Sequence, residues 1–522
     1  MKYAFSIVVF ALALTYGICG SLFNIENRAI HADESEQAST FLKLYRDGEY
    51  RYNPNGPHGP TLYYWANTVE KLTNCTAPET LQIERLRKIM LVMSVIAVVS
   101  FLMILPDMSL CACLLSSAVF VCTSLAQIYG AYFVQEIIFA EGVFLSTLWT
   151  FKFLNRQNII NAVMLGLSAA IAQASKETSV IAFASIFIAL AFLAIIDKTS
   201  RAQLRNLTKS LKKCVLAFAV FCAVVALAYS SFGENPKGII DVFRSYYTHF
   251  FDKAGMQEHS ADALFYIKLL FIQKSAGAYF GEILITLLAV VGSATAFSSY
   301  LNRTKTSSIW ADKSNEDKNS LIVIFFVVCA VANIFILSLI KYKTPWLILS
   351  PMMLLCVPAG FALSKVVEMR PIKAIPLLLL MSVAFFYQKK LTDNAVVRFN
   401  SDPRNPFIYS HTVSDEKNLF ERLKQCIEFS KYKNDIPIAF VGKVSPWPLP
   451  WQLRNQNNVG YWTNAPENIN DFDVVITDAF SLADVLKKLD TKQYSSDLFG
   501  LRKNTILTVF IKKDIFEKIT SQ

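Results

Sequence analysis

Charged residues are scarce in this sequence and unevenly spread. Only 17% of its 522 residues are Asp, Glu, Lys or Arg, whereas soluble chains carry roughly a quarter. The scarcity comes from nine long runs that contain no charged residue: 3–23, 89–106, 108–135, 157–175, 178–196, 214–233, 283–302, 319–340 and 344–364. Each run is near or above the roughly 18 to 20 residues that span a bilayer as a helix. This pattern excludes an ordinary soluble globular protein.

Two further runs are weaker candidates for membrane helices. Residues 137–154 contain Glu141 and Lys152, and residues 374–388 are short for a span. With the nine uncharged runs they predict eleven membrane helices, and therefore an α-helical polytopic membrane protein. The first run also fits a signal peptide, although it lacks an Ala-x-Ala site and is long for that role.

Acidic residues are fewer than basic residues, which gives the chain a net charge of +11. In a soluble protein this excess would point to nucleic acid, but in a membrane protein basic residues gather in cytoplasmic loops, so no nucleic acid is expected. With the N-terminus inside, the basic loops 197–213 and 303–318 are cytoplasmic. The short outer turns then hold only three basic residues: Lys176, Lys341 and Lys343. One basic cluster falls on the outer side and opposes this orientation: Arg85, Arg87 and Lys88.

This orientation divides the chain into two predicted domains. Residues 1–388 form a membrane domain with a large first outer loop, 24–88, and residues 389–522 form a soluble extracytoplasmic α/β domain. In the tail, apolar residues at helical spacing predict a helix over 414–432. Short β-branched runs predict three strands: 436–442, 473–478 and 504–513. The tail has no phosphate-cradling glycine loop, so a second nucleotide-binding enzyme is not indicated.

Cysteines outside the apolar runs are few. Eight of the ten lie in predicted spans, where they act as small apolar residues. Only Cys75 and Cys426 are predicted outside the membrane. One disulfide bridge and two solitary thiols both fit this count.

Histidine is also rare, and all five histidines fall in segments predicted on the outer side: His31, His58, His249, His259 and His411. Ionisable residues at the ends of the spans are predicted on the same side: Glu136, Glu141, Lys176, Glu177, Glu282, Lys341 and Lys343. An ionisable residue at membrane depth is a functional candidate. A residue at a helix end can instead extend its charge to the membrane surface. Both interpretations stay open for each residue, while their gathering on one face favours a site.

The first outer loop carries the more specific signal. "HADESEQA" places His31 beside the adjacent carboxylates Asp33 and Glu34. A stiff segment rich in Gly and Pro follows, and it holds His58 close to an aromatic group of the kind found at membrane interfaces: Tyr63, Tyr64 and Trp65. The pattern predicts an acidic, histidine-containing site at the outer membrane face.

Several blocks of the sequence resemble known membrane enzymes. The acidic pair after the first helix resembles the GT-C glycosyltransferases, such as protein O-mannosyltransferases and the lipid A aminoarabinose transferase. The blocks are similar, more closely, to a prokaryotic family of flippase-associated proteins of archaeal N-glycosylation. They are "HADES", "GEYRYNP…HGPTLYY", "KET" at 176–178, "YKTPWL" at 342–347 and "PWPLPWQLR…VGYW" at 446–462. They run in order through nearly the whole chain.

The resemblance implies an inverting glycosyltransferase that takes a sugar from a polyprenyl-phosphate donor. Its acceptor would be a hydroxyl of a lipid, glycan or protein at the outer face of the plasma membrane. Asp33 matches the family's catalytic carboxylate and would deprotonate the acceptor. Glu34 would orient Asp33, or make Asp33 a stronger proton acceptor because the two like charges are close together. Lys176 and Lys343 would bind the lipid phosphate. Further substrate- or phosphate-binding candidates are His58, Glu141, Glu177 and, more weakly, Lys341.

A metal ion and the tail raise separate questions. His31, Asp33 and His58 are ligand types for Zn²⁺ or Mn²⁺, and a divalent ion (Mg²⁺, Mn²⁺ or Zn²⁺) is one possibility, although no spaced histidine motif is present. In the tail, three tryptophans alternate with prolines and suit either carbohydrate stacking or a packed core: Trp447, Trp451 and Trp462.

Two functions of other classes compete with the enzyme. A flippase or transport component would move a lipid-linked glycan without making a bond, and would favour charges near the bilayer midplane. A non-catalytic glycan-binding scaffold would need the tail but not Asp33. Because the predicted midplane segments are almost free of charge, the sequence favours the enzyme.

Overall fold

The computed structural model describes residues 2–56, 58–73, 77–248, 261–306, 315–409 and 411–521. It contains two compact units. We call Met1–Glu26, Lys43–Cys75 and Glu84–Arg398 the membrane unit, and Asn27–Leu42, Thr76–Ile83 and Phe399–Gln522 the tail unit. The tail unit therefore includes the acidic segment around Asp33, and the domain boundary placed after residue 388 stays a prediction. Three residues singled out in the sequence lie outside the described residues: Cys75, His249 and His259.

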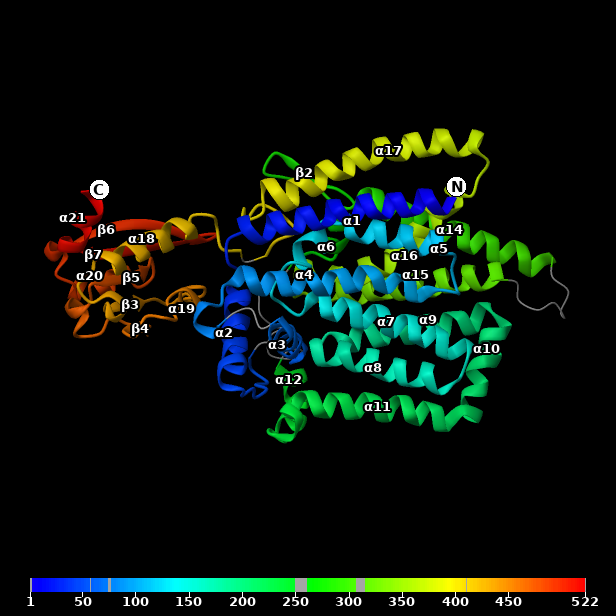
Figure 1. Cartoon of the computed structure of the whole chain (residues 1–522), viewed down its shortest axis with the longest axis horizontal. Coiled ribbons are helices and arrows are strands. Elements are labelled where there is room, and N and C mark those ends of the chain that lie inside the picture. Colours follow the sequence, from blue (N-terminus) through cyan, green and yellow to red (C-terminus); the bar gives the residue numbers. More distant parts are fainter. Residues whose placement is uncertain are drawn as a thin grey trace. The chain divides into compact units, whose positions relative to one another are not determined.

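The eleven predicted spans correspond to eleven helices, coloured from blue to yellow in Figure 1. These are α1 (Lys2–Asn27), α4 (Ile83–Ser100), α5 (Leu110–Val121), α7 (Glu136–Asn155), α8 (Ile159–Ser175), α9 (Ser179–Ile196), α11 (Leu211–Tyr229), α14 (Ile283–Thr306), α15 (Asn315–Leu339), α16 (Leu349–Val367) and α17 (Pro371–Asp393). Within the described residues, nine helices are long and apolar enough to cross a membrane, and α5 and α8 are shorter apolar helices. The chain is a multi-pass membrane protein, as the sequence predicts.

The uncharged run 108–135 does not form one helix, which corrects the prediction of a single span there. After α5 the chain breaks, and a second helix, α6 (Ser124–Tyr129), begins. The Thr123 side chain accepts a hydrogen bond from the backbone N–H of Ala126 (2.9 Å). The backbone N–H of Ser124 donates to the Glu282 carboxylate (2.6 Å). These two acceptors satisfy the donors of a new helix start, so the break costs no unpaired N–H group at these positions.

Glycine allows some membrane helices to approach closely. A Cβ atom on Gly142 of α7 would lie 2.6 Å from the backbone nitrogen of Ala172 on α8. A Cβ on Gly360 of α16 would lie 2.3 Å from the backbone nitrogen of Ser116 on α5. No larger residue fits at these crossings without moving a backbone. Packing of small residues therefore fixes two helix pairs where lipid offers no hydrophobic driving force.

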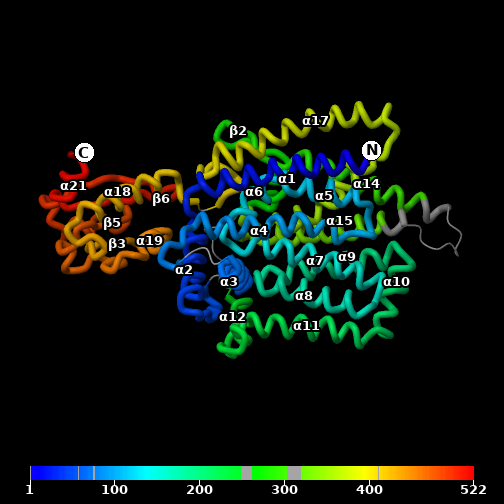
Figure 2. The backbone as a smooth tube through the Cα atoms, in the orientation of Figure 1, coloured from blue at the N-terminus to red at the C-terminus, as the bar shows by residue number. Residues whose placement is uncertain are grey.

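Shorter elements lie at the two ends of the membrane helices. They are α3 (Thr61–Thr73), α10 (Lys198–Arg205), α12 (Gly238–Tyr247), α13 (Phe265–Leu270) and an antiparallel pair, β1 (Gln273–Ser275) and β2 (Ala278–Phe280). Figures 1 and 2 show α10 lying across the ends of α9 and α11, at the same end as the N-terminus of α1. The elements α3 and α12 lie at the opposite end of the membrane unit. The helix α11, which joins α10 to α12, therefore runs from one end of the membrane unit to the other.

The tail unit is built on a five-stranded mixed sheet in the order β4-β3-β5-β7-β6. Its elements are α18 (Glu416–Phe429), β3 (Ile438–Val441), α19 (Leu449–Gln452), β4 (Val459–Trp462), β5 (Val474–Asp478), α20 (Leu482–Lys488), β6 (Tyr494–Arg502), β7 (Thr505–Lys512) and α21 (Lys513–Thr520). Strands β4, β3 and β5 are parallel, β7 runs antiparallel to β5, and β6 runs antiparallel to β7. The predicted mixed sheet with helices is confirmed, and β4 and β6 are additional to the three predicted strands.

Alternating side chains along β3 serve two cores. Ile438 and Phe440 pack with apolar residues of α18 and α21 on one face of the sheet. Ala439 and Val441 pack with Val485 of α20 on the other face. Because a central parallel strand is buried on both faces, its sequence reads as a continuous apolar run, as in "IPIAFVG".

Candidate functional site

The acidic segment of the tail unit begins helix α2 (Ala32–Asp47), and His31 caps that helix. The Nδ1 atom of His31 accepts a hydrogen bond from the backbone N–H of Asp33 (3.0 Å). The backbone N–H of His31 in turn donates to the Glu34 carboxylate (3.3 Å). This is a reciprocal capping box in which histidine takes the place usually held by Ser or Thr. "HADE" is therefore a helix-start motif as well as an acidic cluster.

The two adjacent carboxylates lie in opposite environments. The Glu34 side chain is 0% exposed and forms an ion pair with Arg28 at 2.8 Å, itself 0% exposed. The Asp33 side chain is 50% exposed, with a carboxylate oxygen 3.9 Å from His31 Nδ1. Only Asp33 can therefore receive a proton from a molecule in solvent. The geometry favours a structural role for Glu34.

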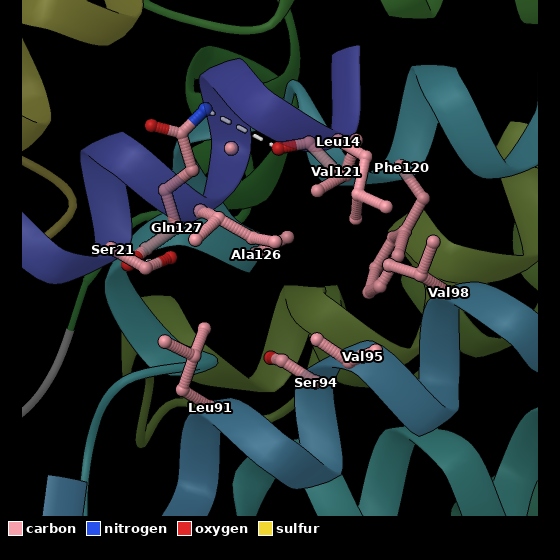
Figure 3. Close-up of a pocket in the computed structure, with 12 residues that line it drawn as sticks. Leu14, Ser21, Leu91, Ser94, Val95, Val98, Phe120, Val121, Ala126 and Gln127 are labelled. Atoms are coloured by element: carbon pink, nitrogen blue, oxygen red, sulfur yellow. Dashed lines mark hydrogen bonds between the residues drawn. The ribbon is translucent and has the colours of Figure 1, made fainter. Parts of the chain in front are cut away.

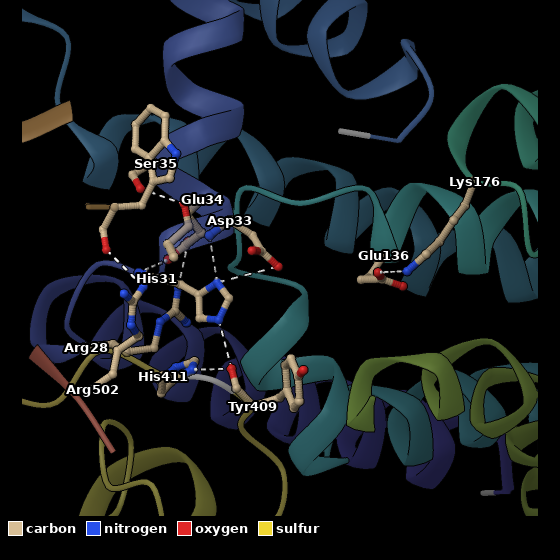
Figure 4. Close-up of polar contacts among 12 residues, drawn as sticks. Arg28, His31, Asp33, Glu34, Ser35, Glu136, Lys176, Tyr409, His411 and Arg502 are labelled. Carbon is tan, nitrogen blue, oxygen red and sulfur yellow. Dashed lines mark hydrogen bonds and ion pairs between the residues drawn. The ribbon is translucent and has the colours of Figure 1, made fainter. Parts of the chain in front are cut away.

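The His31 ring is fixed from its other side by the segment around Tyr409 (Figure 4). Its Nε2 atom lies 2.8 Å from the carbonyl oxygen of Tyr409. Since Nδ1 accepts and a carbonyl can only accept, Nε2 carries the proton. The ring of His411 lies 4.9 Å from that of His31, and burial, followed by the nearby His31 and Arg28, holds the pKa of His411 well below its usual value. The two rings thus lie together at the first turn of α2.

Arg502 connects the acidic segment with the tryptophan-proline block. Its guanidinium donates to the carbonyl oxygens of Trp447 (3.1 Å) and Ser445. Burial lowers the pKa of Arg502, while the negative charge of Asp33 raises it. A cation thus lies within electrostatic range of Asp33, on the last residue of β6.

The tryptophans of the tail do not share one environment. Trp451 is 1% exposed, and the guanidinium of Arg454 stacks 3.9 Å from its ring centre. Trp462 packs edge-on against Phe472 at 5.3 Å, and Trp447 is half-buried. For Trp451 the packing interpretation therefore holds.

In the membrane unit, three of the quoted sequence blocks meet around the turn at 176–178. Lys176, 3% exposed, forms an ion pair with Glu136 at the start of α7 (Figure 4). Its ammonium also lies 5.8 Å from the ring centre of Trp346, in the "YKTPWL" block. The positive charge of Lys176 is therefore already balanced by one carboxylate.

Glu177, the next residue of that turn, contacts His58 of the first loop. Glu177, 2% exposed, contacts Nδ1 of His58 at 2.7 Å and accepts a bond from the Tyr52 hydroxyl at 3.4 Å. Burial, and next the charge of Glu177, raise the pKa of Tyr52. The backbone N–H of Gly59 donates to the carbonyl of Ser175 (3.1 Å), and a Cβ there would lie 2.1 Å from a backbone oxygen. Only glycine fits after His58, which gives a physical reason for the "HGP" block.

The remaining candidates in the membrane unit have structural contacts of their own. Lys343 is buried, and its ammonium donates to the carbonyl oxygens of Ser338 (2.9 Å) and Ile340 at the end of α15. Burial lowers the pKa of Lys343, and Asp262 partly offsets this. Lys341 is exposed. Glu141 is buried on α7 and accepts a hydrogen bond from the Ser100 hydroxyl (3.0 Å). Lys343 thus serves as a C-terminal helix cap as it stands.

A metal ion finds no ready set of ligands in the described part of the chain. There, no three side chains of His, Cys, Asp or Glu lie together in a way that could hold one. Both ring nitrogens of His31 are engaged by the backbone, which leaves neither free to bind a metal in this arrangement. We therefore derive no step through a metal.

A small internal pocket is too small to hold a substrate. It lies between α1, α4, α5 and α6, with a volume of about 20 Å³, which is room for about one water molecule. Figure 3 shows Ser94 and Gln127 facing it, with the Gln127 amide donating to the Val121 carbonyl (3.2 Å). A sugar cannot enter this space.

Several contacts at the candidate site were not apparent from the sequence. Arg28 precedes the acidic pair and His411 was noted only as an outer histidine, yet both lie against the His31 cap. The sequence contained one usable signal, a lone cation six residues before Glu34. Nothing in the sequence pairs His58 with Glu177, because that contact depends on tertiary structure.

Comparison with known proteins identifies the fold. No family model and no curated protein sequence matches the chain. Among solved structures, ArnT from Cupriavidus metallidurans bound to undecaprenyl phosphate matches with a TM-score of 0.61 and 10% identity, covering 96% of this chain and 97% of that one. Its apo state matches with a TM-score of 0.56 and 11% identity, over the same 96% and 97%.

A third solved structure extends the comparison. An oligosaccharyltransferase of Archaeoglobus fulgidus, in complex with zinc and sulfate, matches with a TM-score of 0.55 and 13% identity. The match covers 97% of this chain and 75% of that one. The chain has the GT-C fold. The GT-C resemblance seen in the sequence is thereby confirmed at the level of fold. The narrower likeness to flippase-associated proteins stays a prediction.

Proposed function

We propose that this GT-C protein is an inverting glycosyltransferase that moves a sugar from a polyprenyl-phosphate donor to an acceptor hydroxyl at the membrane surface. The observation that carries the proposal is the half-exposed Asp33 carboxylate, held in the first turn of α2 by the His31 cap. The fold supports the class of reaction, and the lipid bound to ArnT supports the class of donor.

The reaction is a single displacement. The acceptor oxygen forms a bond to the anomeric carbon while the bond from that carbon to the phosphate oxygen breaks. The acceptor proton passes to Asp33, and the bonding electrons leave with the lipid phosphate. The departing anion needs positive charge.

Lys176 is our first candidate for that charge. Its ammonium is buried with Glu136, so it would release this carboxylate, or share it, when the phosphate arrives. Glu177 and His58 would hold the turn that carries Lys176. Lys343, Lys341 and Glu141 are weaker candidates, because the first caps α15, the second is exposed and the third bonds Ser100. The acceptor would be a lipid, glycan or protein.

The orientation belongs to the same proposal. The basic segment 197–213 lies at the end of the membrane unit that carries α10, which the distribution of charge assigns to the cytoplasm. Glu136, Lys176 and His58 lie toward the other end. We therefore assign this end of the membrane unit to the extracytoplasmic face of the plasma membrane. Eleven predicted spans from a cytoplasmic N-terminus assign residues 389–522 to the same face.

Replacing Asp33 with Asn tests the proposal. In a host that lacks the gene, Asp33→Asn should restore protein level but not glycosylation, since positioned proton transfer contributes about 100-fold or more to rate. Asp47→Asn is the matched control, because Asp47 lies on the same helix, is exposed and forms an ion pair with its sequence neighbour Arg46. Mass spectrometry of glycolipids and glycoproteins gives the readout.

The same experiment separates the enzyme from a transport component. If Asp33→Asn restores the full glycan profile while the empty host lacks it, Asp33 is not the base and a flippase role gains support. If the Asn variant leaves one specific sugar missing and the control restores it, the glycosyltransferase stands.

A further inference from the structure

A second cavity, unrelated to the candidate site, lies within the membrane unit. It has a volume of about 450 Å³, within the range of small-molecule sites, and it is bounded by α7, α8, α9, α10 and α11. Nearly all of its lining is apolar, including Phe153, Leu165 and Phe221. A cavity of this composition suits a hydrocarbon chain.

The cavity opens sideways, toward the region that lipid occupies. Two of its lining residues are among the most exposed aromatic side chains of the membrane helices, with Phe187 of α9 70% exposed and Phe218 of α11 67% exposed. Two further lining residues, Phe183 of α9 and Phe221 of α11, contact each other edge-on at 6.4 Å. Because Phe187 and Phe218 both line the cavity and are exposed, an acyl chain from the bilayer can reach it without passing through water.

A basic segment lies at the end of the cavity. Leu204 and Leu207, on α10 and the turn after it, line the cavity. The same segment presents five exposed cations: Lys198, Arg201, Arg205, Lys209 and Lys212. Its one acid in 197–213, Asp197, is buried and accepts bonds from Ser200, so it does not offset them at the surface. An amphipathic helix with a basic face attracts anionic lipid headgroups.

We propose that the membrane unit holds one anionic phospholipid of the leaflet at the α10 end, with an acyl chain in this cavity and its phosphate at the basic segment. The apolar lining takes the chain, and the cations of α10 and the following turn take the headgroup. One short segment, 204–209, contributes to both the acyl-chain cavity and the headgroup site. Leu204 and Leu207 line the cavity, while Arg205 and Lys209 are exposed cations between and after them.

This lipid is distinct from the donor of the proposed reaction. The cavity begins at Ser146 on α7, which is ten residues, or about 15 Å along a helix, from Glu136. A polyprenyl chain has several times as many carbons as a fatty acyl chain, and a cavity of this volume does not enclose it. A bound acyl chain would fill the space between α8, α9 and α11 and stabilise their packing.

Native mass spectrometry of the full chain in detergent tests the proposal, with phosphatidylglycerol and phosphatidylcholine as probes. We expect phosphatidylglycerol to be retained at one molecule per chain and to raise the thermal unfolding midpoint more than phosphatidylcholine does. Lys209→Ala combined with Lys212→Ala should weaken retention by about 30-fold, given the contribution of each cation near an anionic headgroup. Lys487→Ala combined with Lys492→Ala removes two exposed lysines of the tail unit and is the control.

A variant that fills the cavity provides a second, independent test of the lipid proposal. Ala169→Phe places a ring in the cavity and should abolish retention of phosphatidylglycerol while the surface cations stay in place. Equal retention of both phospholipids would mean general annular lipid, and would overturn the proposal. Unchanged retention in the double lysine variant, or displacement of the bound phospholipid by equimolar undecaprenyl phosphate, would also overturn it.

Discussion

Two neighbouring carboxylates, Asp33 and Glu34, show how much a single residue position decides. Successive residues of a helix point about 100° apart, so the first turn of α2 directs one acid outward and the other inward. Glu34 meets Arg28 in a buried ion pair, and Asp33 stays half exposed. Of two adjacent carboxylates, Glu34 therefore stabilises the fold and Asp33 is available for chemistry.

The buried pair gives a prediction about stability. Glu34→Gln should lower the free energy of unfolding by about 3–5 kcal/mol, because the buried Arg28 keeps its charge and loses the carboxylate with which it forms an ion pair. Replacing both residues, as Arg28→Met with Glu34→Leu, should cost much less. Thermal unfolding of the purified chain measures both. Equal losses for the single and the double variant would contradict the prediction.

His411 gives a prediction about pH. Its folded pKa lies below the usual 6.5, so below about pH 6.5 the unfolded chain binds a proton that the folded chain does not. Stability should therefore fall as pH drops, by up to about 1.4 kcal/mol per pH unit. His411→Gln should flatten the dependence of the unfolding midpoint between pH 7.5 and 5.5. A variant with the wild-type slope would show that another group titrates there.

At the scale of elements, packing contacts rather than propensity hold the membrane helices at their crossings. The helix α8 packs against α7 at Gly142 and against α11 at Gly166, where a Cβ would lie 2.4 Å from the carbonyl oxygen of Ala217. Both contacts bring backbones together where side chains would normally separate them. The turn after α8 carries Lys176 and Glu177, so these crossings also position the polar cluster.

Gly142 is the position where this dependence is easiest to test. Gly142→Val should lower stability by about 1–3 kcal/mol or more, because the added atoms cannot be accommodated without moving α8. Ala223→Val is the control, since Ala223 is exposed on α11 and its added methyl groups meet open space or lipid. The thermal midpoint in detergent is the readout, and a Gly142→Val chain as stable as the control would refute the packing argument.

At the scale of the whole molecule, the distribution of basic residues predicts which side of the membrane each loop occupies. Thr208 is exposed in the basic segment after α10, and Asn55 is exposed in the first loop. These two segments are predicted to lie on opposite sides of the membrane. This assignment comes from charge alone.

Labelling of introduced cysteines checks that assignment. In intact cells, Asn55→Cys should react with a membrane-impermeant maleimide, and Thr208→Cys should react only after permeabilisation. A chain without either substitution controls for the exposed native Cys19 and Cys222. The reverse pattern would place the proposed active site in the cytoplasm and remove the reason to expect a polyprenyl donor on the outer face.

Hydropathy alone determined the membrane class and located the apolar segments, although it did not show that the run 108–135 breaks into α5 and α6. A bilayer requires about twenty uncharged residues per span, and this constraint is local and can be read from the chain. The same holds for "IPIAFVG" and "DVVITD", whose buried strands need apolar side chains on both faces. The strands β4 and β6 were not predicted, and both lie at the edges of the sheet. Polar residues interrupt β6, and β4 has only four residues, one of them Gly460, so neither forms a continuous β-branched run.

Only the tertiary structure decided which ionisable residues meet. Charge attraction and hydrogen bonding act between buried and partly buried side chains that are far apart in sequence, such as His58 with Glu177 or Lys176 with Glu136. It also decided where the uncharged run 108–135 breaks, since the acid that holds the start of α6 comes from Glu282, far along the chain. The sequence could name the candidates, because each is costly at membrane depth. Their partners depend on three-dimensional distance, which no local pattern encodes.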